Sequence, residues 1–143
     1  MKKLLTILFE VLFFVVAANA QRVSLVPTVE KTVAGNQYGA LLMFQTKKLW
    51  SVGGFYQASL TRTGEGVQTS NPFYGISVNA PLVRAGKMNL YANGRFGVVN
   101  QNFLVIVPGL ETEVRVSRWI SVSALMSMRM SYPSAAARIS IKL

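Results

Sequence analysis

The chain has 143 residues, with 15 Lys or Arg, five acidic residues that are all Glu, and a formal net charge of +10. It contains no His and no Cys, which excludes disulfides, serine or cysteine triads of the usual kind and an ordinary zinc site. The length allows a single domain. Charged residues make up 14% of the chain, against about 25% in ordinary soluble domains. Without disulfides, stability must come from packing, backbone pairing or a membrane.

Residues 1–20 have the three parts of a secretory signal peptide. Two lysines are followed by an apolar core over residues 4–17 and by Ala18-Asn19-Ala20, a small-residue site of the kind that signal peptidase cleaves. Glu10 interrupts the core, and an uncleaved N-terminal anchor is the alternative, but the apolar run is short for a membrane-spanning helix. We therefore predict a signal peptide over residues 1–20 and one exported domain over residues 21–143. After export, the positive charge favours anionic lipid head groups as partners over nucleic acid.

After residue 21 the apolar residues recur at every second position, which is typical of β-strands with two unlike faces. No segment there shows a convincing amphipathic helical pattern. Short polar stretches and stretches with Gly or Pro separate the alternating segments. The pattern predicts eight strands, over residues 22–29, 38–46, 49–60, 72–82, 88–98, 103–116, 119–132 and 135–143.

The fifth and seventh predicted strands alternate clearly. In MNLYANGRFGV, residues 88–98, Met, Leu, Ala, Phe and Val share one face, whereas Asn, Tyr and Arg share the other. In residues 120–131 every second residue is apolar, and most of the residues between them are Ser, with Arg129 among them. The second strand, which contains YGALLMFQ, is apolar on both faces and does not alternate.

The predicted connections fall into a short and a long group. We expect tight turns at residues 47–48, 84–87 and 117–118, and longer links at residues 30–37, 61–71 and 99–102. Pro133 and Ser134 are expected to form a two-residue hairpin turn. Strands at regular spacing with such turns between them predict an antiparallel sandwich or barrel. Because the strand count is even, both ends of the domain should lie on the side of the short turns.

The polar face distinguishes a soluble barrel from a transmembrane one. A soluble barrel turns its apolar face inward, whereas a transmembrane barrel turns it toward lipid. Water-facing strand surfaces normally carry many Lys, Glu and Thr residues, but here the polar face consists of Ser, Gly and Asn with scattered Arg and few Glu. Small residues suit the narrow lumen of an eight-stranded barrel, and most predicted strands have the roughly 9–11 residues that cross a bilayer. We therefore expect the apolar side chains to face outward.

Aromatic residues near the predicted strand ends indicate the same orientation. Tyr and Trp favour the membrane interface because their rings are apolar while their polar edges stay hydrated. The alternative is that each of them is an ordinary core aromatic. The predicted girdles are Tyr38, Tyr74, Phe96 and Tyr132 beside the longer links, and Phe44, Trp50 and Trp119 near the short turns.

The signal peptide, the period-two strands and the last strand together resemble small outer-membrane barrels of the OmpX/OmpA type, over residues 21–143. The last strand ends the chain with Ala137, Ile139, Ile141 and Leu143 on one face, similar to the assembly signal of that family, whose terminal residue is usually aromatic. The resemblance implies an eight-stranded antiparallel up-and-down transmembrane β-barrel in the outer membrane of a Gram-negative-type cell envelope. Known enzymes of that architecture depend on His, often with Asp, and this chain has neither.

The remaining candidate site is a group of charged residues on the polar face. Glu111 and Glu113 lie two residues apart with Arg115 beside them, which favours a structural ion network over an acid/base pair. With a turn at residues 133–134, Arg129 and Arg138 would lie opposite each other, an unfavourable pair unless a carboxylate or an anion separates them. The predicted lumen charge network comprises Arg95, Glu111, Glu113, Arg115, Arg129 and Arg138.

We expect no catalytic, cofactor-binding or metal-binding residues. The leading hypothesis is a non-enzymatic integral outer-membrane barrel with a polar, largely plugged lumen, which acts as a structural or accessory subunit of an outer-membrane complex. The alternatives are a narrow anion-preferring porin-like channel that uses Arg95, Arg129 and Arg138, and a soluble periplasmic ligand-binding barrel. The cations of the short turns lie against lipid head groups or a partner, or they are simply solvated; they are Lys47, Lys48, Arg84, Lys87 and Arg118.

Overall fold

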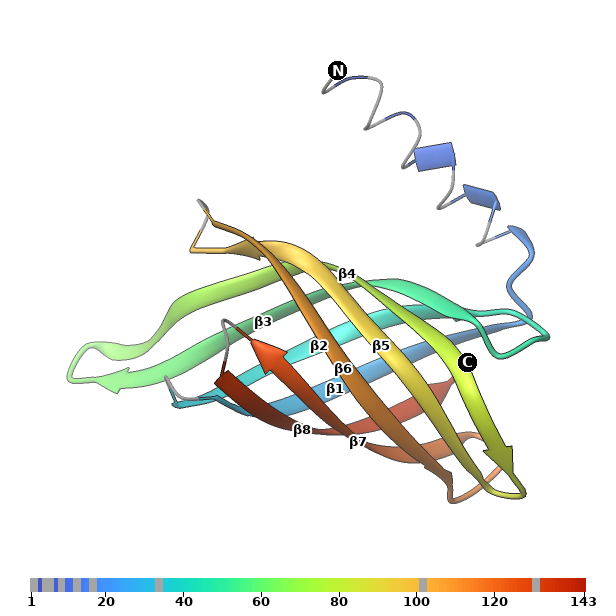
Figure 1. Cartoon of the computed structure of the whole chain (residues 1–143). Coiled ribbons are helices and arrows are strands. Elements are labelled where there is room, and N and C mark those ends of the chain that lie inside the picture. Colours follow the sequence, from blue (N-terminus) through green and yellow to red (C-terminus); the bar gives the residue numbers. More distant parts are fainter. Residues whose placement is uncertain are drawn as a thin grey trace.

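The computed structural model describes residues 3, 7, 10, 11, 14, 15, 18–32, 35–100, 103–129 and 132–143. Its strands are β1 (Arg22–Thr32), β2 (Gly35–Gln45), β3 (Ser51–Thr63), β4 (Gly66–Ala85), β5 (Met88–Val99), β6 (Phe103–Arg115), β7 (Ile120–Arg129) and β8 (Tyr132–Lys142). Each strand pairs antiparallel with the next, and β8 pairs with β1, so the sheet closes into a barrel (Figure 1). The predicted eight-stranded antiparallel barrel is confirmed.

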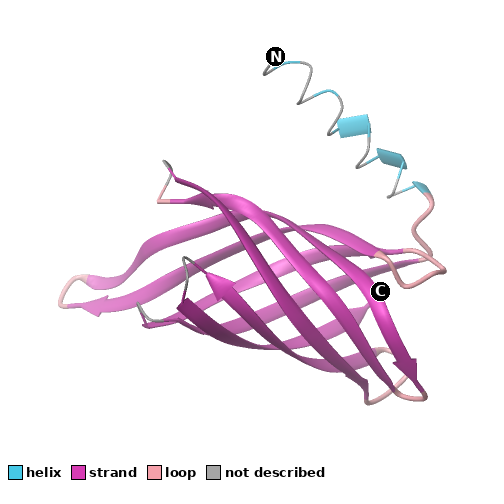
Figure 2. Cartoon of the chain, in the orientation of Figure 1, coloured by secondary structure: helices cyan, strands magenta, loops and turns pink. Residues whose placement is uncertain are grey.

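The described residues that precede the barrel include short helical pieces. Residues 3, 7, 10, 11, 14, 15 and 18 are helical, and Figure 2 shows them in cyan, apart from the magenta barrel. Within the described part of the chain, no helix has the length and apolar character needed to cross a membrane. The signal peptide over residues 1–20 stays a prediction.

The two ends of the barrel differ, and we call them the terminal end and the hairpin end. The terminal end carries both ends of the barrel chain, because the Leu143 amide donates to the Val23 carbonyl and the Lys142 amide to the Trp119 carbonyl, both at 2.8 Å. The turns after β2, β4 and β6 lie at this end, and the connections after β1, β3, β5 and β7 lie at the hairpin end (Figure 1). The chain ends and the three turns that were predicted to be short share one end, as expected. The predicted size difference between the two ends is wrong, because residues 46–50 separate β2 from β3 whereas only residues 64–65 separate β3 from β4.

Apolar side chains face outward along the strands. In β7, Ser121, Ser123 and Ser127 are buried inside the barrel, whereas Met126 between them is 71% exposed. The pattern recurs in β6, where Leu104 is 79% exposed. Side chains of a strand alternate between the two faces of the sheet, so one face of each strand lines the lumen and the other covers the outside. The outside is the more apolar of the two.

The lumen is nevertheless not polar throughout. An apolar cluster inside the barrel comprises Val26, Leu41, Met43, Phe55, Phe73, Val99 and Val107. This cluster accounts for the second predicted strand, which is apolar on both faces, because β2 sends Leu41 and Met43 inward while Leu42 is exposed outside. The interior therefore contains an apolar cluster, which the sequence pattern did not predict, together with charged residues, which the pattern did predict.

Two of the predicted long links are wrong. Strand β1 continues to Thr32 and β2 begins at Gly35, so residues 30–37 belong to a hairpin whose residues 33–34 lie outside the described part. Strands β3 and β4 stay paired from Ser59 with Ser70 to Thr63 with Gly66, which leaves a turn of only residues 64–65. Asn71, which was expected to end the strand, adopts a φ of 50° and lies beside a register shift between β3 and β4 that follows Gln57. A β-bulge at this position lets the strand continue through Asn71 and Pro72.

The predicted turn at Pro133-Ser134 is also wrong. Both residues belong to β8, where Pro133 pairs with Met128 and Ser134 with Ser127; the connection itself, residues 130–131, lies outside the described part. The pairing of β8 with β1 begins only at Ala135, so Pro133 lies before that ladder, a position near a strand end where Pro is tolerated. The expected facing pair of arginines is lost, since Arg138 pairs with Ser123.

Candidate functional site

Three charged layers cross the lumen, and the one nearest the hairpin end is built around Arg95 of β5. The Arg95 guanidinium donates two hydrogen bonds to the Glu30 carboxylate of β1, at 2.6 and 2.9 Å, and one each to Gln57 Oε1 and Ser127 Oγ, both at 2.9 Å. The side chains of Arg95 and Glu30 are both 0% exposed. A two-point contact between guanidinium and carboxylate is strong and directional. The pair ties β1 to β5 across the barrel.

Two aromatic rings pack against the same guanidinium. The Arg95 Cζ atom lies 6.0 Å from the ring centroid of Phe55 and 5.6 Å from that of Phe73. The two rings meet edge to face with their centroids 4.7 Å apart. A desolvated cation over such rings gains a favourable interaction. The apolar cluster and the charged layer therefore form one packed unit, in which Arg95 has polar partners on one side and rings on the other.

The middle layer is organised by Glu111 of β6. Its carboxylate accepts hydrogen bonds from Arg138 Nη1 at 3.0 Å, Ser123 Oγ at 2.8 Å and Asn79 Nδ2 at 2.9 Å. Arg138 is buried, and its Nε and Nη2 atoms have no hydrogen-bond partner among the described residues. Asn93 of β5 donates to Asn79 Oδ1 and to a serine of β4, which extends the layer. The carboxylate is held by three donors from β4, β7 and β8.

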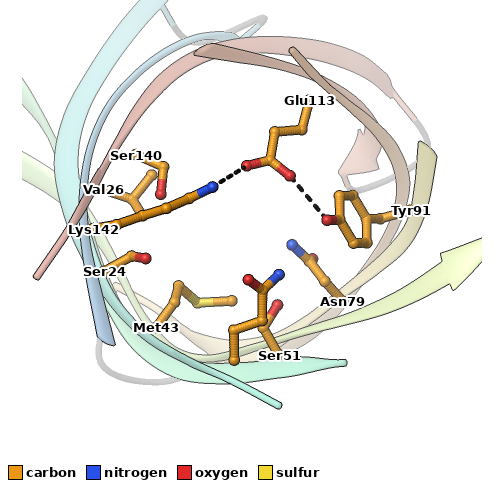
Figure 3. Close-up of a pocket in the computed structure, with 10 residues that line it drawn as sticks. Ser24, Val26, Met43, Ser51, Asn79, Tyr91, Glu113, Ser140 and Lys142 are labelled. Carbon is orange, nitrogen blue, oxygen red and sulfur yellow. Dashed lines mark hydrogen bonds and ion pairs between the residues drawn. The ribbon is translucent and has the colours of Figure 1, made fainter. Parts of the chain in front are cut away.

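The layer nearest the terminal end is organised by Glu113, two residues further along β6. Its carboxylate accepts hydrogen bonds from Tyr91 Oη at 2.8 Å, Asn89 Nδ2 at 3.2 Å and Ser121 Oγ, and Lys142 Nζ lies 3.5 Å away. Figure 3 shows Lys142 and Tyr91 reaching Glu113 from opposite sides of the lumen. A cavity of about 40 Å³ lies beside these residues, enough room for a few water molecules next to polar groups.

Each of these three interior carboxylates thus forms an ion pair with a cationic side chain. The pairs are Glu30 with Arg95, Glu111 with Arg138, and Glu113 with Lys142. A buried charge is tolerated when it is paired and hydrogen-bonded, and the interior meets that condition in all three layers. Two further members of the predicted network differ: Arg115 is half-buried and forms no ion pair with a described residue, and the side chain of Arg129 lies outside the described part.

The predicted aromatic girdle residues lie mainly on the outer surface. Tyr38, Tyr74, Phe96, Trp50 and Trp119 are exposed. Phe44 is half-buried, and the Tyr132 side chain lies outside the described part. Tyr56, which the sequence analysis did not single out, stacks on Tyr74 with ring centroids 6.4 Å apart.

Sequence reasoning missed several interior partners, of which Glu30, Gln57 and Lys142 matter most. Glu30 was assigned to a loop, yet it continues the inward series of Ser24 and Thr28 at period two. This period-two series could have predicted that Glu30 points into the barrel. The contact of Gln57 with Arg95 joins residues 38 positions apart and carries no local signal, because it depends on how the barrel closes.

A closed antiparallel barrel with an apolar outside and paired charges inside is the architecture of transmembrane β-barrels. No protein-family model matches the chain, and no curated protein is similar to it in sequence. Solved structures are similar in fold, among them the following two. One comes from work titled "De novo design of transmembrane beta-barrels" (TM-score 0.70, 12% identity, 87% of this chain and 97% of that one). The other is the solution structure of the de novo designed TMB2.3 (TM-score 0.64, 14% identity, 85% and 95%).

Among the described residues, no three His, Cys, Asp or Glu side chains come together as a metal site. At the low sequence identities above, the structural likeness concerns the fold alone.

Proposed function

We propose that the protein is a non-enzymatic integral outer-membrane β-barrel, exported by a signal peptide over residues 1–20, with a lumen closed by charged layers. The observation that carries this proposal is the distribution of the side chains. Arg95 and Glu30 are fully buried at the centre while Met126 and Leu104 are largely exposed outside. In water this arrangement would leave large apolar side chains solvated around the barrel. In a bilayer the apolar side chains contact lipid and the charged side chains stay inside the barrel.

The exposed apolar residues argue against a soluble ligand-binding barrel. Monomeric soluble proteins rarely expose contiguous apolar patches larger than a few hundred Å². Here exposed apolar residues occur on every strand of the barrel, among them Leu25, Leu42, Leu60, Val83, Phe96, Ile106, Met128 and Ile139. A soluble barrel of this kind would bury those residues and would not place Arg95 and Arg138 inside, yet both arginines are buried here.

The charged layers support a closed lumen over a channel. An ion that passed the Arg95 layer would have to break the two-point contact with Glu30 and displace Gln57 and Ser127. Breaking a buried ion pair typically costs about 3–5 kcal/mol. One observation favours the anion-preferring channel as the second candidate: Arg138 keeps two guanidinium nitrogens without a partner among the described residues, which an anion could use.

The environment of the interior carboxylates supports a role without catalysis. Glu111 and Glu113 each accept three hydrogen bonds and lie beside a cation. A general acid or base needs a free position from which to exchange a proton with a substrate. Such saturated carboxylates instead hold strands together, and the protein then serves as a structural or accessory subunit beside other outer-membrane components.

Fractionation and gel mobility test the proposal. The protein should partition with the outer-membrane fraction, and its folded form should migrate differently on SDS gels from the boiled form. Its N-terminus, read by mass spectrometry, should be Gln21. Reconstitution into planar bilayers should give no conductance above background, whereas steady anion-selective current would establish the channel instead. Recovery in the soluble fraction with unchanged gel mobility would contradict the membrane barrel.

A further inference from the structure

Every turn at the terminal end carries an exposed cation. Lys47 and Lys48 lie on the β2–β3 turn, Lys87 on the β4–β5 turn and Arg118 on the β6–β7 turn. We call these four residues the cationic rim. The described residues of these turns, 46–50, 86–87 and 116–119, include no acidic residue. The rim therefore surrounds much of the barrel mouth with uncompensated positive charge.

Each part of the rim lies beside an exposed apolar side chain. Trp50 is 51% exposed, Met88 50% and Trp119 57%, and each lies one or two residues from a rim cation. The Arg118 guanidinium lies 5.6 Å from the Trp119 ring centroid, which keeps its charge close to the apolar surface. Cations beside exposed aromatic and apolar side chains are typical of a membrane–water interface. Solvated turn residues need no such neighbours.

The other charged residues near this mouth have a different setting. Arg84, which the sequence analysis grouped with the turn cations, pairs in register with Asn89, whose side chain is buried in the lumen. Arg84 therefore shares the lumen-facing side and is not part of the rim. At the hairpin end, the described turn after β3 consists of Gly64 and Glu65, so its charged residue is acidic. The described turns at the terminal end thus carry cations and no acidic residue, whereas the described turn after β3 carries an acidic residue.

We infer that the cationic rim binds the phosphate groups of anionic phospholipids in the leaflet at the terminal end, an inference that rests on the proposed membrane insertion. Lys presents a point charge to a phosphate, and Arg presents a forked pair of donors. A Lys or Arg near an anionic lipid surface strengthens association roughly fivefold. An acidic soluble protein would match the charge, but it would leave the neighbouring tryptophans without an apolar partner. A lipid surface satisfies both features.

The two tryptophans make the test direct, because they are the only Trp residues of the chain and both lie at the rim. The purified full-length protein is reconstituted into phosphatidylcholine vesicles in which a fixed fraction of lipid is brominated. The brominated lipid is either phosphatidylcholine or phosphatidylglycerol, and it quenches Trp fluorescence at short range. At low salt, we expect relative association of phosphatidylglycerol to exceed that of phosphatidylcholine about two- to fivefold. In molar salt the ratio should fall toward one, since exposed charges are screened.

A pair of single variants locates the effect. Lys87→Gln removes one cation from the rim, whereas Lys31→Gln removes one exposed cation near the hairpin end. Lys87→Gln should lower the phosphatidylglycerol preference, and Lys31→Gln should leave it unchanged. The combined variant Lys47→Gln/Lys48→Gln/Lys87→Gln should lower the ratio further than Lys87→Gln does at low salt. It retains Arg118, so the surroundings of Trp119 are preserved.

Each outcome decides one point. Equal quenching by the two lipids at low salt, in protein whose gel mobility shows that it is folded and inserted, overturns the lipid inference and leaves the proposed function intact. A preference that the combined variant leaves at the wild-type level overturns the assignment to the rim. Absence of quenching by either lipid, with unchanged gel mobility, means that the protein does not insert and contradicts the proposed function itself. The salt dependence of the wild-type protein keeps the test valid if a variant fails to fold.

Discussion

Replacement of Arg95 by Met should destabilise the barrel strongly, because it removes the guanidinium that donates two hydrogen bonds to the Glu30 carboxylate in a site without solvent. Arg95 donates four hydrogen bonds, two of them to Glu30, and both side chains are 0% exposed. Removal of one partner of a buried ion pair costs about 3–5 kcal/mol. Met fills much of the vacated volume beside Phe55 and Phe73, so the loss should reflect the lost ion pair with Glu30 more than a cavity.

The double variant Arg95→Met/Glu30→Met separates that cause from general loss of packing. Exchange of a whole buried ion pair for apolar side chains of similar volume is often neutral or stabilising. The double variant should therefore recover about 2 kcal/mol or more relative to Arg95→Met, and the thermodynamic cycle should give a large coupling energy between the two positions. Lys31→Met, which removes an exposed cation on the same strand as Glu30, should change stability by less than about 0.5 kcal/mol.

Urea titration of the proteins in phosphatidylcholine vesicles measures these differences, with Trp fluorescence and gel mobility as two independent reports of unfolding. A loss below about 1 kcal/mol for Arg95→Met would show that water reaches the guanidinium and the carboxylate, and that the layer is not closed. A double variant as unstable as the single one would show that Glu30 is not the partner that matters.

Three further predictions use the same titration. Leu110→Arg places a charge on the outer face of β6 and should cost about 2–4 kcal/mol if that residue lies near the bilayer midplane; a negligible loss would argue that the outer face is hydrated. Gly75→Ala should cost about 1–3 kcal/mol, because its Cβ would lie 2.0 Å from a carbonyl oxygen of β5, whereas Gly54→Ala, with no other atom closer than 3.9 Å, should be tolerated. Tyr91→Phe removes a hydrogen bond to the Glu113 carboxylate and should cost about 1.5–3 kcal/mol; equal stabilities would show that water replaces the hydroxyl.

The sidedness of the barrel could be predicted from the sequence because it follows from local alternation. In β7 each Ser between apolar residues marks the lumen face, and the structure buries Ser121, Ser123 and Ser127. The strand count followed from the same pattern. Period two is a property of neighbouring residues, so no knowledge of distant contacts is needed to find it.

The errors arose where one local signal has more than one structural outcome. Pro133 and the pair at residues 71–72 both suggest turns, yet one lies near a strand end and the other beside a bulge. The position of the β7–β8 turn sets the register, and a turn shifted by a few residues separated Arg129 from Arg138. The partners of the interior charges depend on barrel closure, which brings β1 and β5 face to face across the lumen. No pattern within either strand predicts that contact.

Spin labels along β7 provide the most direct test of the central arrangement. The chain has no Cys, so single Cys variants at residues 121–128 each take one nitroxide label after reconstitution into vesicles. Accessibility to oxygen, which concentrates in lipid, should be high at residues 122, 124, 126 and 128 and low at residues 121, 123, 125 and 127. Accessibility to a water-soluble nickel chelate should be low for the first group. High oxygen accessibility at the odd-numbered residues, or equal accessibility at all eight, would contradict a barrel that turns its apolar side chains to lipid and keeps its charges inside.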